Sequence, residues 1–323
     1  MKVVFYNRTL LSGGIEKCIE LLSKSIYKDF EVDIIYTHSE KLDPNIVEVL
    51  SRYGNVYKLE DKVVDCDVAI WCSLYFEYHD LKKQIHARKN IAWIHSMPRI
   101  LPDCLLDDET FINDMDELIC VSEAVKNNLH IKKEGRVIHN LMAEDFLELS
   151  NDNSVDYPDD SLNLVVVSRL SRGKGFDRLL NFANQIKEKN IPFNIKVVGK
   201  GRADEEKIKK SFAHLPEVEF VGYQENPYRY IKKADYLTQL SDDESWCNTI
   251  TEAKILGVPV IVTNFESSKE QVVHLENGII VPLDEINYND YIDLAIEHKT
   301  RLRDNLKDFK FKNELETWYE IFK

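Results

Sequence analysis

The residues from 241 to 257 read SDDESWCNTITEAKILG, and together with their neighbours they decide how the chain is expected to fold. Just before them, Tyr236–Leu240 alternates as a short buried strand does, and Thr249–Leu256 carries apolar residues at helical spacing. The polar turn between strand and helix places Glu244 in a loop and Glu252 about two helical turns further on. A strand, a polar turn and a helix in this order predict one unit of a parallel α/β sheet.

The start of this helix is a candidate anion site. Its first backbone amides, from Cys247 to Ile250, have no partner inside a helix, and such amides bind phosphate. Glu244 and Glu252 are eight residues apart, so both carboxylates can face one ligand and accept hydrogen bonds from sugar hydroxyls. An anion site beside two acids indicates a sugar nucleotide. Two glutamates at this spacing also occur by chance in acidic helical proteins, so the neighbouring motifs have to decide.

Composition limits the classes of protein to consider. The chain has 323 residues, 44% hydrophobic and 30% charged, which is enough for two globular domains. The net charge of -14 argues against a nucleic-acid binder, because a phosphate polymer would be repelled. The six cysteines show no CxxC pair and no zinc-ligand spacing, so we expect reduced thiols and no structural metal. The first residues, MKVVFYNRT, lack a signal-peptide pattern and no run could span a membrane, so a cytoplasmic protein is expected.

Apolar runs alternate with helical stretches along the chain, which predicts two Rossmann-like domains with doubly wound parallel sheets. In the first half the predicted strands are Val3–Asn7, Val32–Thr37, Val68–Ser73, Asn90–His95, Glu117–Ser122 and Val137–Leu141. In the second half they are Leu164–Val167, Ile195–Val198, Val218–Val221, Tyr236–Leu240, Val258–Val262 and Gly278–Val281. The polar stretch 151–161 is the expected linker between domains at 1–150 and 162–300, and the helical segment 301–323 could brace the two.

Residues at the carboxyl ends of parallel strands are the first candidates for a site. In the first half these are Asn7, Ser73, His95 and Ser122. His95 ends the apolar strand IAWIH, where either a ligand contact or a capping or buried structural histidine would fit.

Asp65 and Asp67 form a DxD pair, a pattern that can hold a divalent ion against a nucleoside diphosphate. The pair leads into the strand Val68–Ser73 at its amino end, away from the edge where ligands bind. We therefore interpret the pair as structural and expect no metal.

Two turns that contain glycine lead from a strand into a helix. Gly13 and Gly14 follow the first strand and would let the backbone approach a ligand closely, although a plain tight turn would also explain them. In the second half, Arg169 and Lys174 flank a glycine-rich turn after a strand. Their guanidinium and ammonium groups can converge on one diphosphate, with a solvated basic turn as the alternative.

Gly199 and Tyr223 follow the next two strands of the second half. They would form the wall around a nucleotide base, unless they belong to ordinary turns between strand and helix.

The acceptor side of a site is harder to place. Tyr75, Phe76 and Tyr78 follow a strand and could stack on sugar faces, with core packing as the alternative, and Arg99 is a further candidate for contact with an acceptor. A local basic group could lie near anionic lipid headgroups, as a peripheral membrane contact, or form a solvated helix face; it consists of Lys82, Lys83, Arg88 and Lys89.

Taken in order, these motifs resemble those of retaining glycosyltransferases of family 4, which have the GT-B architecture of two Rossmann-like domains facing a cleft. The resemblance covers almost the whole chain and rests on GGIEK, IAWIHS, CVSEAV, VIHN, VVVSRLSRGKGF, VVGKG, FVGY, the two spaced glutamates, GVPVIVT and NGIIVP. It implies transfer of a sugar from a nucleoside diphosphate sugar, UDP being the commonest carrier, to a glycan or lipid-linked saccharide. No cofactor and no metal are expected.

The resemblance also implies roles for individual residues. Arg169 and Lys174 stand where the family binds the donor diphosphate, Gly14 in the loop that closes over it, and Glu252 where the ribose is held. Glu244 matches the acid at the donor sugar, and His95 a histidine that points at the reacting centre. The backbone amides beside Glu244 belong to Trp246, Cys247, Asn248 and Thr249.

One departure affects the donor. Where the family often has Gly-Phe-Gly, this chain has Ser245, Trp246 and Cys247, and the bulkier side chains could alter the sugar pocket. Two other functions stay open from the sequence: a sugar-nucleotide-binding subunit without catalysis, and a sugar-nucleotide epimerase of similar architecture.

Overall fold

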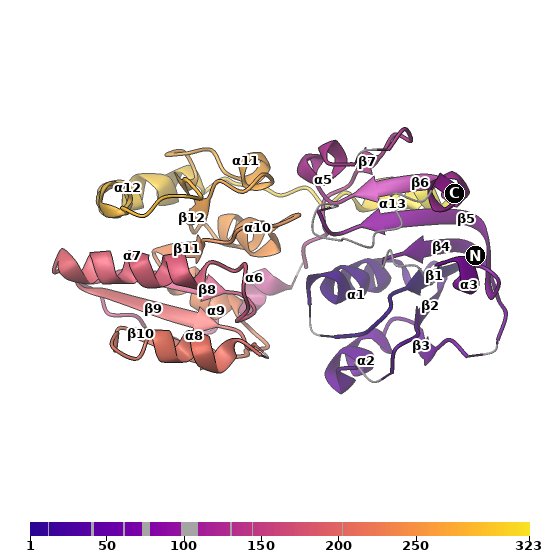
Figure 1. The fold of residues 1–323 in the computed structure, drawn as a ribbon, viewed down its shortest axis with the longest axis horizontal. Coiled ribbons are helices and arrows are strands. Elements are labelled where there is room, and N and C mark those ends of the chain that lie inside the picture. Colours follow the sequence, from indigo (N-terminus) through magenta and orange to yellow (C-terminus); the bar gives the residue numbers. More distant parts are fainter. Residues whose placement is uncertain are drawn as a thin grey trace. The chain divides into compact units, whose positions relative to one another are not determined.

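The computed structural model describes residues 1–11, 13–39, 42–60, 62–72, 78–97, 109–129, 131–143, 145–201 and 203–323. They form two compact units, one of Met1–Met142 with Asn313–Lys323 and the other of Ala143–Lys312 (Figure 1). The border between the units lies a few residues before the polar stretch expected as a linker, and the C-terminal residues group with the first unit. Each unit is built on a parallel sheet, so the predicted α/β fold class is confirmed.

The described residues of the second unit form a six-stranded sheet in the order β10-β9-β8-β11-β12-β13. Its strands are β8 (Leu162–Val167), β9 (Phe193–Val198), β10 (Val218–Gly222), β11 (Tyr236–Gln239), β12 (Val260–Thr263) and β13 (Gly278–Val281). The chain runs outward from β8 through β9 to β10 and then returns to β11 on the other side of β8. Ligands of such sheets bind at the carboxyl ends of the strands where this reversal occurs, here between β8 and β11.

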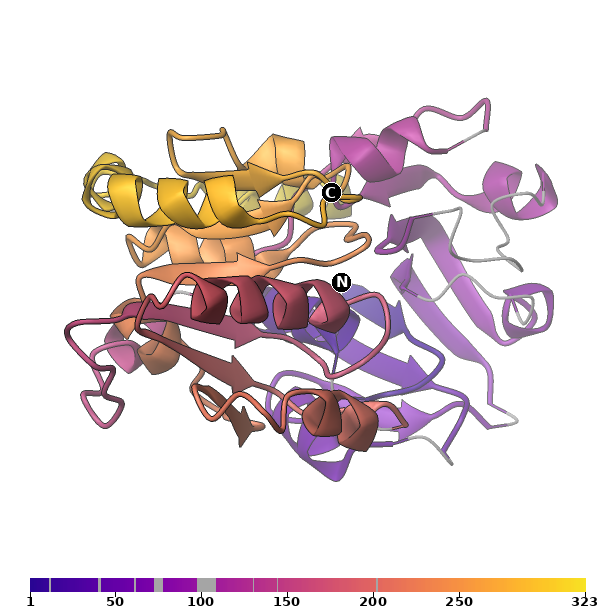
Figure 2. The same cartoon turned by 60° about the vertical axis from the view of Figure 1, so that its left-hand side comes forward.

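Helices cover this second sheet. They are α6 (Phe146–Leu149), α7 (Phe176–Glu188), α8 (Glu205–Ser211), α9 (Tyr228–Lys233), α10 (Asn248–Ile255), α11 (Ser268–Gln271) and α12 (Asn289–Asn305). α7 and α12 lie side by side across the sheet (Figure 2), and Phe182 of α7 packs edge-on against Tyr288 with ring centroids 5.4 Å apart. Apolar side chains of both helices and of the strands form the core of this unit.

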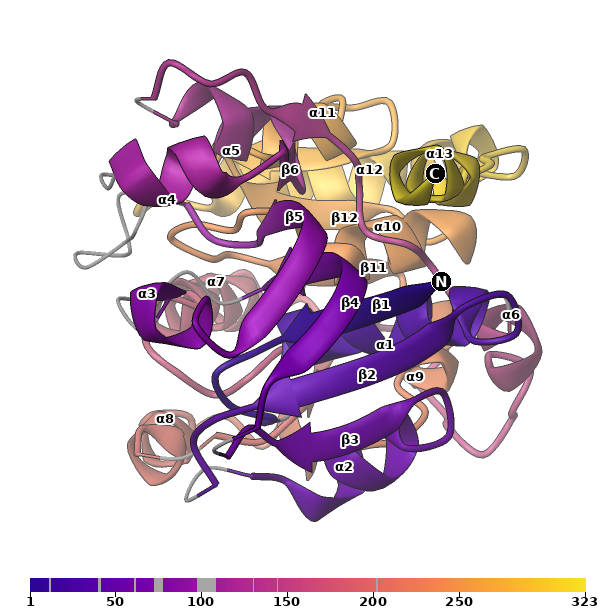
Figure 3. The same cartoon turned by 90° about the vertical axis from the view of Figure 1, so that its right-hand side faces the viewer.

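In the described residues of the first unit, seven strands pair in the order β3-β2-β1-β4-β5-β6-β7. They are β1 (Lys2–Tyr6), β2 (Glu31–Tyr36), β3 (Asn55–Lys58), β4 (Val64–Trp71), β5 (Ile85–Ile94), β6 (Glu117–Cys120) and β7 (Arg136–Val137). Figure 3 shows β5, β4, β1, β2 and β3 next to one another in this order. The edge strand β3 was not predicted, and the strand predicted at Val137–Leu141 is reduced to the two residues of β7.

The helices of the first unit include the last one of the chain. They are α1 (Gly14–Ile26), α2 (Pro44–Leu50), α3 (Tyr78–Leu81), α4 (Glu109–Asp114), α5 (Glu123–Asn127) and α13 (Leu315–Phe322). Trp318 of α13 is buried and its ring centroid lies 4.9 Å from that of Trp93 in β5. Lys89 Nζ donates to the backbone oxygen of Ile321 at 2.8 Å, which ties α13 to the same strand. Among the described residues, none of the helices has the length and apolar character needed to cross a membrane.

Candidate functional site

The loop between β8 and α7 packs closely against the end of β11. Gly175, the residue before α7, has a φ of 70°, and a Cβ placed on it would lie 1.7 Å from the backbone oxygen of Leu240. Only glycine combines this left-handed conformation with so close a backbone approach. The loop that carries Arg169 and Lys174 is therefore fixed beside the loop that carries Glu244.

Lys174 and Glu244 form an ion pair at the centre of this edge. Lys174 Nζ lies 2.7 Å from Glu244 Oε1, and the two side chains are only 21% and 15% exposed. Ser241 Oγ donates to the same carboxylate oxygen at 2.8 Å, and Gln239 Nε2 lies 3.3 Å from it. The two residues that the sequence placed at the diphosphate and at the sugar are thus in direct contact.

Arg169 presents a second positive charge from the same loop. Its side chain is exposed, and within the described ranges we find no hydrogen bond or ion pair to its guanidinium group. The neighbouring Arg178 behaves differently, because its Nη1 donates to Leu240 O at 3.2 Å and contacts Asp242 Oδ1 at 2.6 Å. Arg178 thus holds the β11 loop in place, whereas Arg169 remains available for an anion.

The start of α10 is clamped by a residue that the sequence did not single out. Gln271 is buried; its Oε1 accepts from Cys247 N at 3.2 Å and its Nε2 donates to Cys247 O at 2.9 Å. Gln271 Nε2 also donates to Thr251 Oγ1 at 2.9 Å. Burial raises the pKa of the Cys247 thiol to about 12, so Cys247 is a neutral packing residue and not a nucleophile near neutral pH.

Two of the backbone amides expected to face the ligand are already used, because Cys247 N donates to Gln271 Oε1 at 3.2 Å and Ile250 N to Cys247 O at 3.1 Å. Trp246 and Cys247 precede α10, Asn248 and Thr249 begin it, and Glu252 follows one turn later with a partly exposed side chain. Helix α10 has no acidic residue in its first turn that would compete for its amides. An anion is therefore favoured at this helix start.

Gly199 and Tyr223 lie at the ends of β9 and β10 in the same unit. Gly199 has a φ of 142°, and a Cβ placed on it would lie 1.9 Å from Ser168 O, so the ends of β8 and β9 are in close contact. Tyr223 is 53% exposed, and Lys200 Nζ lies 5.0 Å from the centroid of its ring. This aromatic surface is suited to stacking on a flat ligand ring.

In the first unit, the Gly13–Gly14 turn starts α1. Asn7 is buried at the end of β1, and its Nδ2 donates to Thr9 O at 2.8 Å and to Glu16 Oε1 at 3.2 Å. Asn7 thus holds the loop together. Apart from its chain neighbours and the backbone of α1, no described atom lies within 4 Å of a Cβ placed on Gly14, so there is open space beside this residue.

His95 follows β5, and its ring packs against Trp93 with centroids 4.3 Å apart. Its Nε2 atom is buried and has no hydrogen-bond partner among the described residues. Burial lowers the pKa of His95 to about 3, which keeps the imidazole neutral. Ser122, the other described candidate of this sheet edge, caps α5 by accepting from Val125 N at 3.0 Å.

The acceptor candidates Tyr75, Phe76 and Arg99 lie outside the described residues, as does the strand-end candidate Ser73. Tyr78 is a core residue: its ring packs edge-on against Trp71, with centroids 4.8 Å apart, and it is 2% exposed. Each cation of the predicted basic group has an acidic partner; the pairs are Lys82–Asp114, Lys83–Asp80, Arg88–Asp67 and Lys89–Glu117.

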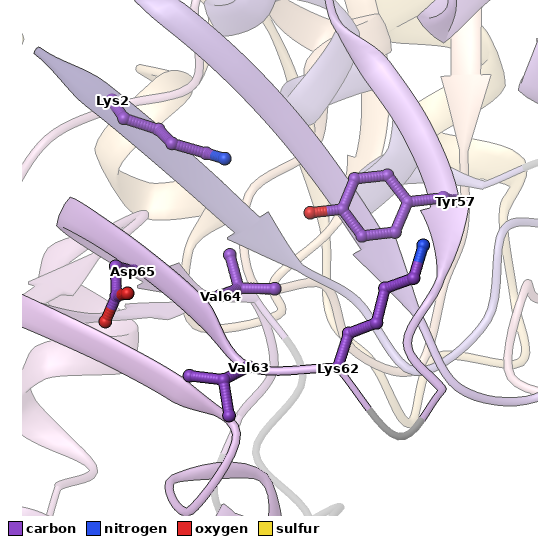
Figure 4. A pocket seen from close by; sticks show the side chains of 6 residues that line it. All are labelled: Lys2, Tyr57, Lys62, Val63, Val64 and Asp65. Carbon is purple, nitrogen blue, oxygen red and sulfur yellow. The ribbon is translucent and has the colours of Figure 1, made fainter.

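Asp65 and Asp67 lie inside the first half of β4, because this strand begins at Val64 and not at Val68 as predicted. Asp67 Oδ2 accepts from the backbone nitrogen of Lys2 at 2.8 Å, and Asp65 lies 3.4 Å from His86 Nδ1. Asp65 also lines a cavity of about 400 Å³ together with Lys2, Tyr57, Lys62, Val63 and Val64 (Figure 4). No group of three or more potential metal ligands is found among the described residues.

Sequence reasoning missed three polar residues around Glu244 and α10. Gln239 and Ser241 bond to the Glu244 carboxylate, and Gln271 fixes Cys247. Gln239 gave a signal, since it is a polar residue in a stretch predicted as buried strand. Gln271 gave none, because its partners lie in another element.

Comparison with known proteins places the chain in a family. The model described as Glycosyl transferases group 1 matches residues 150–312, just over half of the chain. An uncharacterized 41.2 kDa protein in the cps region of Klebsiella pneumoniae is 26% identical over 262 residues, and the match spans 79% of this chain and 66% of that protein. An uncharacterized glycosyltransferase of Methanocaldococcus jannaschii is 27% identical over 314 residues, covering 88% and 84% of the two chains.

Solved structures show the same fold. Anabaena Alr3699/HepE, in complex with UDP and glucose, matches 95% of this chain and 93% of its own with a TM-score of 0.74 at 15% identity. This confirms the predicted GT-B class of two Rossmann-like domains. Since the family model covers the unit that carries Arg169, Lys174, Glu244 and Glu252, the chain belongs to the group 1 glycosyl transferases.

Proposed function

We propose that this protein transfers a glycosyl group from a nucleoside diphosphate sugar to a hydroxyl group of an acceptor. The observation that carries the proposal is the arrangement at the β8–β11 edge: an exposed Arg169, the Lys174–Glu244 ion pair at 2.7 Å, and the start of α10. Positive charge and helix amides suit a diphosphate, while the carboxylates of Glu244 and Glu252 suit sugar hydroxyls.

In the proposed reaction, the bond between the anomeric carbon and the diphosphate oxygen breaks, and both electrons leave with the diphosphate. The acceptor oxygen forms the new bond on the same face of the sugar, and its proton passes to the departing phosphate, so the anomeric configuration is retained. Arg169, Lys174 and the amides at the start of α10 stabilise the charge that grows on the leaving group.

In this proposal Lys174 also positions Glu244. With Glu244 as its partner, its ammonium group holds the acid in place before the donor arrives. Arg169, which has no such partner in the described part of the chain, supplies the cation that is free to meet the diphosphate. The roles that the family resemblance implies for Gly14 and His95 stay predictions.

UDP is the proposed carrier and a glycan or lipid-linked saccharide the proposed acceptor, as in the synthesis of a bacterial cell-surface polysaccharide. The first is supported by the relative structure that contains UDP and glucose. The second is supported by the capsular polysaccharide biosynthesis glycosyltransferase CapM of Staphylococcus aureus, which is 23% identical over 189 residues. The match spans 48% of CapM and 66% of the Klebsiella pneumoniae relative, and the proposal concerns the part that the chain contains.

A thermal-shift panel tests the donor. UDP-glucose, GDP-mannose and ADP-glucose, each beside its free nucleoside diphosphate, are added to the purified chain. A ligand at about a hundred times its Kd stabilises the folded chain by about 2.7 kcal/mol, so the correct donor raises Tm by several degrees. A flat panel at millimolar ligand would contradict the proposal.

Catalysis is tested by donor hydrolysis without an acceptor, because a transferase releases the diphosphate slowly to water whereas a binding subunit does not. We expect the release to persist in EDTA, since the proposed charge stabilisation uses only protein groups. Loss of turnover in EDTA, with recovery on adding Mg²⁺ or Mn²⁺, would overturn the proposed metal independence.

A further inference from the structure

Gln239 is a buried amide at the end of β11, with 2% of its surface exposed. Its Nε2 donates to Ser241 Oγ at 2.6 Å and lies 3.3 Å from Glu244 Oε1. Ser241, which is fully buried, donates from Oγ to the same Oε1 at 2.8 Å. Gln239 thus acts on Glu244 both directly and through Ser241.

The donors and acceptors fix the direction of this hydrogen-bond chain. An amide nitrogen can only donate, and a hydroxyl group has a single proton. Because Ser241 Oγ accepts from Gln239 Nε2, its proton is left for the Glu244 carboxylate. If the amide were turned the other way, the oxygen of Gln239 would face the carboxylate oxygen of Glu244. Both atoms are acceptors, so no hydrogen bond could form between them.

The result is an asymmetric carboxylate. Oε1 of Glu244 accepts from Lys174, Ser241 and Gln239, whereas no hydrogen bond to Oε2 is found in the described part of the chain. The backbone of Glu244 is also held, because its oxygen accepts from Ser267 Oγ at 2.7 Å. The acid therefore has one oxygen committed to the protein and one left for a ligand.

We propose that Gln239 is a positioning residue that, with Ser241, turns Oε1 of Glu244 toward the protein and reserves Oε2 for one hydroxyl group of the donor sugar. The inference rests on the proposed function, since it takes the ligand of Glu244 to be the sugar half of a nucleoside diphosphate sugar. It predicts that Gln239 governs recognition of the sugar and leaves recognition of the nucleotide unchanged.

Calorimetric titration separates these two contributions. The probes are UDP-glucose, GDP-mannose and ADP-glucose, each against its free diphosphate, and the test uses the probe pair that the wild-type chain prefers. Gln239→Leu is expected to weaken binding of the nucleotide sugar roughly five- to tenfold, the size of one lost hydrogen bond, with less than about a twofold change for the free diphosphate. Ser241→Ala removes the other of these two hydrogen bonds to Oε1, the one from Ser241 Oγ, and serves as the second variant.

Two controls sharpen the test. Thr238→Val is a control at the residue beside Gln239. The Oγ1 of Thr238 is buried and has no hydrogen-bond partner among the described residues, so this variant should bind the nucleotide sugar and the free diphosphate as the wild type does. In a Glu244→Ala background, which has no acceptor for Gln239 or Ser241, Gln239→Leu should cause no further loss, because its effect passes through the Glu244 side chain.

The outcomes are distinguishable. Equal weakening of nucleotide and nucleotide sugar would show a purely structural role and overturn the inference, as would unchanged binding of both by Gln239→Leu and Ser241→Ala. If the wild-type chain binds none of the probes, the proposed function fails, and the inference fails with it.

Discussion

Arg169 and Lys174 share one turn but differ in their surroundings, and this difference has consequences for single substitutions. Lys174 already contacts Glu244, whereas Arg169 is exposed and carries an uncommitted charge in the described part of the chain. Without Lys174, the Glu244 carboxylate has no lysine charge to offset its own. A substitution of Lys174 would therefore affect both the stability of the fold and catalysis. Arg169 offers the cleaner test of the leaving-group role.

Arg169→Ala is expected to lower the rate of donor turnover by about a hundredfold, by analogy with the loss of one oxyanion donor. Arg172→Ala is the matched control and should change the rate less than about twofold. This nearby arginine is 84% exposed, and its Nε lies 3.6 Å from Asp204 Oδ1. Rates are measured as release of diphosphate. Similar rates for Arg169→Ala and wild type would remove Arg169 from the site.

His95 should make the stability of the protein depend on pH. Its folded-state pKa of about 3 lies below the ordinary value of 6.5, so between these values the unfolded chain binds a proton that the folded chain does not. The contribution of His95 to the free energy of unfolding is therefore largest above pH 6.5. It decreases as the pH falls from 6.5 toward 3, by up to about 1.4 kcal/mol per pH unit.

His95→Phe keeps a ring on Trp93 and should flatten this part of the pH dependence of the unfolding free energy, measured with urea at pH 4 to 7. His214→Gln, at an exposed histidine of the second unit, is the control that should leave the slope unchanged. An identical slope in His95→Phe and wild type would show that His95 does not titrate in this way.

At the scale of elements, the contact between the β8 loop and the end of β11 decides whether the site forms. Gly175 and Gly257 both have a positive φ, of 70° and 72°, but only Gly175 has a backbone atom in the way of a Cβ. Gly257→Ala should cost only the conformational term, about 1–2 kcal/mol. Gly175→Ala should cost about 3–4 kcal/mol, because Leu240 must also move, and urea unfolding measures both. Equal losses would mean that the two loops are not in tight contact.

Much of this element level could be predicted from the sequence. Strands β8, β12 and β13 are mostly apolar runs, whereas β9, β10 and β11 also contain polar residues; all six were predicted within two residues at either end. β3 was missed because NVYK is a short edge strand with partly exposed side chains, which leaves little hydrophobic signal. The ends of β6 and β7 were overextended, because the apolar residues that follow them are buried outside the sheet.

The site was predicted in part, for a similar reason. Motifs located Arg169, Lys174 and Glu244, but their sequence did not show that Lys174 and Glu244 touch, since that depends on β8 lying next to β11. Gln271 could not be found at all, because its role comes from three hydrogen bonds to residues about twenty positions away in the chain.

At the scale of the whole molecule, the chain ends in the unit where it began. Residues 313–323 leave the second unit and place α13 on the first, where Trp318, Ile321 and Phe322 are all buried. Glu314 adds a polar contact, because its Oε1 lies 2.9 Å from His139 Nδ1. The first unit should therefore be incomplete without the end of the chain.

Deleting residues 313–323 is expected to destabilise the first unit by more than about 3 kcal/mol, the usual cost of removing a buried tryptophan side chain. Hydrogen exchange should show faster exchange in β5 while β8 and β11 keep their protection. Removal of Lys323 alone, which is exposed, is the control. Unchanged protection of β5 in the longer deletion would contradict the assignment of α13 to this unit.

In the proposed function, the carboxyl edge of the second sheet at β8 and β11 binds the diphosphate of a sugar nucleotide. The most direct measurement is a crystal structure of the chain with the nucleotide sugar that gives the largest thermal shift. We predict phosphate oxygens within hydrogen-bond distance of the Arg169 guanidinium and of an amide at the start of α10, with a sugar hydroxyl on Glu244. Phosphates bound elsewhere, for example between Lys2 and Lys62 in the cavity of the first unit, would contradict the account.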